Sequence, residues 1–249
     1  MKNQIIKGTI SENSFASRYD RLHATPSDAM DRAKTFPPIS EANKIIADYL
    51  QDWHGNLLEV GCGRGELLIQ SPSHFDVKIG IDFSEVFLKD AVLFTEKYSE
   101  TPEKIQWILH DLNEKWPFED AYFDVVVSAA SIEHIFDVYH IFRESNRCLK
   151  NGGYFYFSVP NIAYIKHRVR LLFGLQPVTA SSLNLWWRDY WDGTHLHYFT
   201  IGAVRMLCRQ TGFDIVEVTG SGSYRHLRKW WTTLLCGDMI VTAKKVRGL

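Results

Sequence analysis

The chain has 249 residues, of which 45% are hydrophobic and 23% charged, and its formal net charge is −1 at pH 7. This balance excludes a protein that binds nucleic acid through its overall charge, because there is no global basic field. No stretch approaches the ~20 apolar residues needed to span a bilayer, and the first residues lack the apolar core of a signal peptide. We therefore expect a cytoplasmic globular protein.

The four cysteines show no pattern typical of a disulfide framework or a zinc site. Cys62, Cys148, Cys208 and Cys236 are scattered, with no CxxC pair and no histidine at ligand spacing. We therefore expect reduced thiols.

The N-terminal third of the chain contains a polar segment and then a helix. The polar segment stops at Pro37 and Pro38, and Ser40 is predicted to cap the helix that follows. Its apolar residues keep the helical period and are Ile45, Ile46, Tyr49, Leu50 and Trp53.

Short apolar runs then alternate with amphipathic segments. The expected strands are NLLEV (56–60), VKIGID (77–82), IQWILHD (105–111), FDVVVSAAS (123–131) and YFYFSVP (154–160). The expected helices begin at ELLIQ (66–70), at Ser84 and near Val138, the last ending at Asn151-Gly152-Gly153. This rhythm predicts a mostly parallel sheet covered on both faces.

The pattern is looser after the fifth strand. Residues 162–199 hold a basic amphipathic helix and a Trp-rich stretch, and a helix over 201–211 ends at Gly212. Two last strands, FDIVEV (213–218) and MIVTAK (239–244), bring the expected total to seven. The prediction is therefore one α/β domain over 1–249, with a Rossmann-like, seven-stranded, mostly parallel sheet flanked by helices.

The stretch LLEVGCGRGELL, residues 57–68, places three glycines in five positions behind the first strand. Glycines at such a turn let a ligand approach the backbone or allow positive φ, and a tight turn without a ligand is the alternative. Ligands of parallel sheets bind at the carboxyl ends of the strands, where Asp82 and Asp111 also fall. Asp82 would accept both ribose hydroxyls of a nucleotide, or else complement the dipole of the next helix.

These motifs together resemble those of the class I S-adenosylmethionine-dependent methyltransferases. EVGCGRG resembles their first motif, an acid followed by Gly-x-Gly-x-Gly, and IGIDFSE resembles the second. LHDLNEKWPFEDAYFDVVVSAASIEHI is similar to the third and fourth, and LKNGGYFYFSVPN to the fifth-strand region. A dinucleotide fingerprint would place its last glycine one residue later, where Glu66 stands. Residues 160–215 more loosely resemble the branch of MetW-like proteins and surface-polysaccharide methyltransferases.

The resemblance implies S-adenosylmethionine as the cofactor and assigns its contacts. The implied cofactor-binding positions are Glu59, Gly61, Cys62, Gly63, Gly65, Asp82, Phe83, Asp111, Leu112, Ser128 and Ala129. The glycines would admit the methionine portion, with Cys62 contributing only its backbone and Glu59 lying near the ammonium. Asp82 would hold the ribose, and Phe83, Asp111 and Leu112 would contact the adenine. Ser128 and Ala129 would form the wall beneath the methyl group.

Two candidate catalytic residues follow from the same resemblance. His134, in SIEHI, comes just after the fourth strand, in a loop that borders the methyl group in this fold. It would take the proton of a hydroxyl acceptor, unless it is a structural residue of its loop. Tyr19 resembles a tyrosine of the N-terminal lids of this family, here residues 1–39, and its alternative role is packing.

A third candidate is His195, in GTHLHYF, whose spacing to His197 places both on one face of an extended segment. These histidines could bind a metal with Asp192 or Glu133, or serve in packing or substrate contact. We expect no metal, because no established ligand spacing is present.

The insertion at 162–199, on the acceptor side, has two further features. Its helix carries cations beside apolar positions, namely Lys166, His167, Arg168 and Arg170 beside Ile165, Val169 and Leu172. A solvated cationic face is expected, and the alternative is contact with a phosphate-bearing acceptor. The aromatics of NLWWRDYWDG, residues 184–193, would stack on a sugar ring or a heterocycle, or pack the lid onto the core.

The sequence thus predicts O-methylation of a small molecule, foremost a sugar, a nucleotide-linked sugar or another surface-glycan building block. The alternative is a MetW-like partner of a biosynthetic acyltransferase. A nicotinamide dehydrogenase is disfavoured by the glycine spacing and by Glu59. No nucleic-acid partner is expected, and the sequence does not indicate the oligomeric state.

Overall fold

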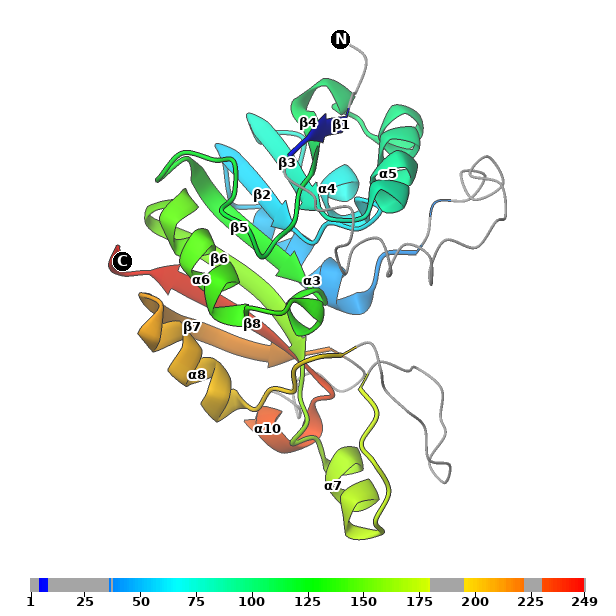
Figure 1. The fold of residues 1–249 in the computed structure, drawn as a ribbon, viewed down its shortest axis with the longest axis vertical. Coiled ribbons are helices and arrows are strands. Elements are labelled where there is room, and N and C mark those ends of the chain that lie inside the picture. The colour runs from blue at the N-terminus through cyan, green and yellow to red at the C-terminus, as the bar shows by residue number, and fades with distance from the viewer. Residues whose placement is uncertain (1–4, 9–35, 37, 180–194, 222–229, 249) are drawn as a thin grey trace.

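The computed structural model describes residues 5–8, 36, 38–179, 195–221 and 230–248 (Figure 1). Its strands are β1 (Ile5–Lys7), β2 (Asn56–Val60), β3 (Val77–Asp82), β4 (Ile105–Leu109), β5 (Phe123–Ala129), β6 (Leu149–Pro160), β7 (Phe213–Gly220) and β8 (Asp238–Lys245). Its α-helices are α3 (Glu41–Leu50), α4 (Glu66–Gln70), α5 (Glu85–Tyr98), α6 (Val138–Cys148), α7 (Ile165–Leu172), α8 (Ile201–Gln210) and α10 (Thr232–Leu235). Single 3-10 turns form η1 (Pro102–Lys104) and η2 (Ile132–His134).

The strands form one sheet in the order β1-β4-β3-β2-β5-β6-β8-β7. Among the described strands, only β8 runs antiparallel to its neighbours, which confirms the expected mostly parallel, Rossmann-like sheet. The expected count of seven strands is wrong, because the sheet has eight. The extra strand is β1, which pairs parallel to β4 with Ile5 opposite Trp107. A strand of three residues is too short to show a recognisable alternation, so its existence depends on the β4 edge.

Helices cover both faces of the sheet (Figure 1). The buried residues of α3, α4 and α5 share a cluster with Leu57 and Val125, whereas those of α6 and α8 share another with Leu58 and Val126. Adjacent residues of a strand point to opposite faces, so continuous apolar strands are the expected sequence pattern for a sheet covered in this way.

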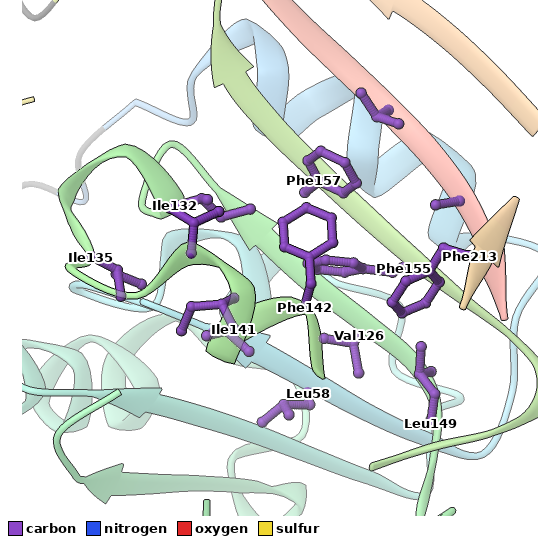
Figure 2. Packing of buried hydrophobic residues seen from close by; sticks show 14 of the residues in the cluster. Leu58, Val126, Ile132, Ile135, Ile141, Phe142, Leu149, Phe155, Phe157 and Phe213 are labelled. Atoms are coloured by element: carbon purple, nitrogen blue, oxygen red, sulfur yellow. The ribbon is translucent and has the colours of Figure 1, made fainter. Parts of the chain in front are cut away.

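The second cluster is rich in aromatic rings (Figure 2). Phe142 of α6 packs edge-on against Phe155 and Phe157 of β6, with ring centroids 5.2 and 5.1 Å apart. Phe213, the first residue of β7, meets Phe155 at 5.6 Å. These contacts fix α6 on the sheet, and the chain segment between β5 and α6 is thereby positioned at the carboxyl ends of the strands.

The structure confirms two helix caps and corrects one helix end. Ser40 Oγ accepts from the Asn43 N–H at 3.0 Å, and Ser84 Oγ accepts from the Phe87 N–H at 3.2 Å. The helix that was expected to end at Asn151-Gly153 ends instead at Cys148. Leu149 already pairs with Phe123 of β5, so the sheet takes over from the helix before the glycines.

Helix α7 has the expected solvated cationic face only in part, because Arg168 is exposed and Lys166 is half-buried, whereas two other members of the face are buried. Arg170 is only 7% exposed and donates from Nε to the Gln176 carbonyl, and His167 is buried as well. Leu172 and Phe173 are 80% and 74% exposed. Short-range periodicity locates the two faces of a helix, but it does not say which one meets the protein.

All four cysteine thiols are buried and none forms a disulfide. Within the described part of the chain, no helix combines the length and the apolar character needed to cross a membrane. Most of the expected N-terminal lid, residues 1–39, and the Trp-rich stretch at 184–193 lie outside the described residues.

Candidate active site

The glycine turn leaves the carboxyl end of β2 and leads into α4. Gly61, Gly63 and Gly65 have φ of +67°, +52° and +78°, a left-handed backbone that other residues rarely adopt. The Gly61 N–H donates to the Ile81 carbonyl at 2.9 Å, and the Gly65 N–H donates to the Cys62 carbonyl at 2.8 Å. The three glycines are therefore needed by the turn itself, whether or not a ligand is bound.

The surroundings of the three glycines separate their roles. A Cβ at Gly61 would collide with the Ser131 side chain, and one at Gly65 would collide with the Trp107 ring. A Cβ at Gly63 would meet nothing within 4 Å. Gly61 and Gly65 therefore allow close packing inside the protein, whereas Gly63 faces open space.

That open space is a cavity of about 200 Å³ at the carboxyl ends of β2, β3 and β5. Of the expected cofactor residues, those that line it are Glu59, Gly61, Cys62, Gly63, Asp82, Phe83, Leu112 and Ala129. The remaining lining residues are Asn43, Glu66, Phe87, Ala130, Ser131, His134 and Ile135. The structure thus brings most of the expected binding residues into one cavity.

Three expected cofactor residues do not line the cavity. Gly65 packs against Trp107, and Asp111 accepts from the backbone and side-chain amides of Asn113, both at 3.0 Å. Ser128 is fully buried and donates to the Val60 carbonyl at 3.1 Å. Of the wall expected at Ser128 and Ala129, only Ala129 lines the cavity, where Ala130 and Ser131 beyond the end of β5 join it. A sequence prediction that ended this strand at Ala129 would have indicated Ala130 and Ser131 as lining residues.

The other residues that sequence reasoning missed come from different elements. Asn43 lies in the first turn of α3, and Phe87 lies in the first turn of α5. The Arg64 guanidinium lies 4.6 Å from the centre of the Phe87 ring and donates from Nε to buried Asp90 at 3.0 Å. These contacts hold Phe87 at the cavity. No local sequence pattern indicates that Asn43 or Phe87 lines it.

Asp82 supports the glycine turn as well as facing the cavity. Its Oδ2 accepts from the Gly63 N–H and its Oδ1 from the Ser84 N–H, each at 2.8 Å. Each carboxylate oxygen has two lone pairs and can accept more than one hydrogen bond, so support of the turn is compatible with a ligand contact.

We expect Asp82→Ala to weaken S-adenosylmethionine binding by about 1.5–3 kcal/mol, the scale of hydrogen bonds to a charged group. Calorimetric titration measures the affinity. Asp82→Asn, which keeps one carbonyl oxygen, is the matched control and should lose less. Unchanged affinity in the alanine variant would contradict this role for Asp82.

Glu59 is a buried carboxylate with an unsatisfied oxygen. It is 4% exposed, and its Oε2 has no hydrogen-bond partner among the described residues. Burial raises its pKa well above the ordinary value, and the nearby Glu66 and Asp82 raise it further. A ligand ammonium would compensate this charge, so the cavity fits the methionine end of the expected cofactor.

We expect Glu59→Gln to lose affinity for the cofactor and to stabilise the ligand-free chain above acidic pH. A raised folded pKa means that ionisation of Glu59 destabilises the fold as pH rises above the ordinary glutamate range. Thermal melts of both proteins across pH should converge in acid and diverge toward neutral pH. If the two proteins show the same dependence of melting temperature on pH, or if Glu59→Gln binds the cofactor as tightly as the wild type, the role assigned to Glu59 is wrong.

A second cavity of about 360 Å³ adjoins the first. Its lining comprises Ser40, Glu41, Ala42, Ala130, Glu133, His134, Ser158, Val159, Pro160, Thr179, His195, Ser221 and Asp238. Ala130 and His134 line both cavities. Ala130 has φ of +51°, a strained backbone for a residue with a Cβ, and its N–H donates to Ser158 Oγ at 3.0 Å. His134 therefore lies where the two cavities meet.

The second cavity also brings together the two expected catalytic histidines. The rings of His134 and His195 pack edge-on with centroids 4.7 Å apart. Glu133 is 3% exposed beside them, and burial raises its pKa to about 8. His197 bonds through Nε2 to the Phe136 carbonyl at 3.1 Å and does not line this cavity. Tyr19 and Asp192 lie outside the described residues.

Comparison with known proteins accords with this geometry. The profile of the family described as "Methyltransferase domain" matches residues 23–218. Among solved structures, phosphoethanolamine N-methyltransferase 2 of Haemonchus contortus in complex with S-adenosyl-L-methionine superposes with a TM-score of 0.65. It is 18% identical, and the match covers 94% of this chain and 60% of that one. The expected Rossmann-like methyltransferase fold is thereby confirmed, and the family match supports S-adenosylmethionine as the cofactor.

Similar curated proteins include ubiquinone biosynthesis O-methyltransferases. That of Pseudomonas syringae pv. tomato is 30% identical over 155 residues, which are 58% of this chain and 65% of the relative. That of Leptothrix cholodnii is 26% identical over 212 residues, which are 81% of this chain and 84% of the relative. The first of these matches thus spans slightly less than two thirds of the relative's length.

Proposed function

The chain belongs to the methyltransferase domain family, and from that premise we propose that it methylates a hydroxyl of a small molecule. The observation that carries this proposal is the position of His134, which lines both the cofactor cavity and the cavity beside it. S-adenosylmethionine supplies a sulfonium methyl group, and its transfer breaks the S–C bond, forms an O–C bond and releases the neutral thioether. The protein has to align the two molecules and exclude water.

The residues of the first cavity hold the cofactor. Glu59 pairs with its ammonium, and the backbone at Gly63 admits the methionine portion. Asp82 holds the ribose through its carboxylate, which lines the cavity, and Phe83 and Leu112 contact the adenine. This assignment is supported by the unsatisfied Oε2 of Glu59 and by the open space at Gly63.

The residues of the second cavity act on the acceptor. The hydroxyl loses its proton beside His134, with His195 as the neighbouring ring. An imidazole is suited to this step near neutral pH. Tyr19 remains a candidate for the same role.

Two classes of hydroxyl acceptor are supported by different observations. The sequence predicts a sugar or another glycan building block, whereas the relatives act in ubiquinone biosynthesis by their names. We therefore retain both a sugar hydroxyl and an aromatic hydroxyl as acceptors. The described cations of α7 lie outside both cavities, so we do not propose a phosphate-bearing acceptor.

The test is turnover by the full chain with S-adenosylmethionine. Panels of hydroxylated sugars and of phenols are incubated with protein and cofactor, and methylated products are detected by mass spectrometry. Formation of a methyl ether in either panel supports the proposal and identifies the class. Cofactor binding without turnover, together with a co-purifying enzyme, would instead support the MetW-like partner role, for which the comparisons offer no support.

A further inference from the structure

Three side chains with metal-ligating atoms converge in the second cavity. The ligand atoms of Glu133, His134 and His195 all lie within 4.8 Å of one another. Glu133 and His134 belong to η2, whereas His195 comes from a distant part of the chain. The Glu133 carbonyl accepts from the Leu196 N–H at 2.8 Å and from the His197 N–H at 3.2 Å, which ties the two segments together.

The Glu133 carboxylate has an oxygen without a hydrogen-bond partner among the described residues, so a cation could bind there. Its Oε1 lies 4.0 Å from His195 Nε2, too far for a hydrogen bond. Its Oε2 is buried and has no hydrogen-bond partner among the described residues. A buried carboxylate oxygen left in this state carries a large desolvation cost unless a cation compensates it.

The orientation of His195 also suits a ligand. Its Nδ1 lies 2.7 Å from Thr179 Oγ1, within hydrogen-bond distance. When Nδ1 donates to this hydroxyl, Nε2 keeps its lone pair on the side of Glu133. Histidines that bind metals are commonly oriented in this way through their other ring nitrogen.

We propose that Glu133, His134 and His195 bind a divalent first-row transition-metal ion, with Zn²⁺ as the best match. Two imidazoles and one carboxylate form one of the donor sets of catalytic zinc sites, in which a fourth position stays open. Tetrahedral bonds of about 2.1 Å place ligand atoms about 3.4 Å apart, so the distances between ligand atoms have to shorten by up to about 1.4 Å. Mg²⁺ is a poorer match, because it prefers oxygen ligands and water.

The purpose of this site rests on the proposed function, although its existence does not. A cation beside the cofactor cavity would favour the ionised form of the acceptor hydroxyl. The O–H bond then breaks with its proton passing to water, and the oxygen forms the new bond to the methyl carbon as the S–C bond breaks. His134 contributes in this arrangement as a ligand.

The experiment measures metal binding without turnover. The full chain is freed of metal with a chelator, dialysed, and titrated calorimetrically with ZnCl₂ and separately with MgCl₂. Glu133→Gln and His195→Ala remove one donor each, and His197→Ala is the matched control because His197 bonds the Phe136 carbonyl instead. Thermal melts confirm that each variant is folded.

We expect the wild type to bind one Zn²⁺ per chain. Glu133→Gln and His195→Ala should each lose about 100-fold or more in Zn²⁺ affinity, and His197→Ala should lose none. Thr179→Val should weaken binding about 10–100-fold by freeing His195, and Thr179→Ser should restore it. Absence of stoichiometric Zn²⁺ binding, or equal binding by wild type and Glu133→Gln, would overturn it. Zn²⁺ binding without methyl transfer would refute the proposed function alone, whereas methyl transfer by metal-free protein would refute the catalytic purpose of the site.

Discussion

Gly63→Arg is expected to abolish S-adenosylmethionine binding while the chain still folds. A Cβ at this position meets nothing within 4 Å and Gly63 lines the cofactor cavity, so we expect the longer side chain to fill that cavity. The left-handed φ of +52° adds a strain of about 1–2 kcal/mol, which most folds tolerate. Calorimetric titration measures the loss of affinity, and a thermal melt measures the change in stability.

Two variants of the same turn serve as controls. Gly63→Ala imposes the same backbone strain without filling the cavity, so it should retain far more affinity than the arginine variant. Gly65→Ala should instead destabilise the protein, because its Cβ would collide with the Trp107 ring. Normal cofactor affinity in Gly63→Arg would mean that this cavity is not the cofactor site.

His134→Ala is expected to lower kcat by about 10²–10⁴-fold and to leave cofactor affinity unchanged. His134 lies where the two cavities meet, so its loss affects the reacting hydroxyl and spares the contacts made by Glu59 and Asp82. The wild-type kcat should rise with pH, because an imidazole accepts a proton only in its neutral form. Steady-state kinetics on the methylated acceptor, with a parallel cofactor titration, measure both quantities.

His195→Ala and Tyr19→Phe separate the candidates for this role. If His134 acts alone as the base, both variants should retain most of the turnover and His134→Ala should not. If His134 and His195 act together as ligands of one cation, both histidine variants should lose turnover and Zn²⁺ binding together. Near-normal turnover in His134→Ala would remove His134 from the mechanism and direct attention first to His195 and then to Tyr19.

The amino-acid sequence by itself determined the core of the fold and most of the residues that line the candidate cofactor cavity. Strands 56–60 and 77–82 were predicted with the bounds that the structure shows, because strands buried on both faces need continuous apolar runs. The caps at Ser40 and Ser84 were predictable because capping is a local interaction. Glu59, the glycine turn and Asp82 were predictable because they end adjacent parallel strands, whose carboxyl ends must meet.

Only the tertiary structure decided which of these residues face the cavity and which other residues line it with them. Gly63 and Gly65 belong to one motif, yet Gly65 packs against the Trp107 ring of β4 and Gly63 faces the cavity. Helix α7 buries Arg170 and exposes Leu172, against its local pattern. The meeting of Glu133 with His195 depends on backbone hydrogen bonds between segments far apart in the chain. Such contacts follow from how the elements pack in three dimensions, which neither periodicity nor motif spacing encodes.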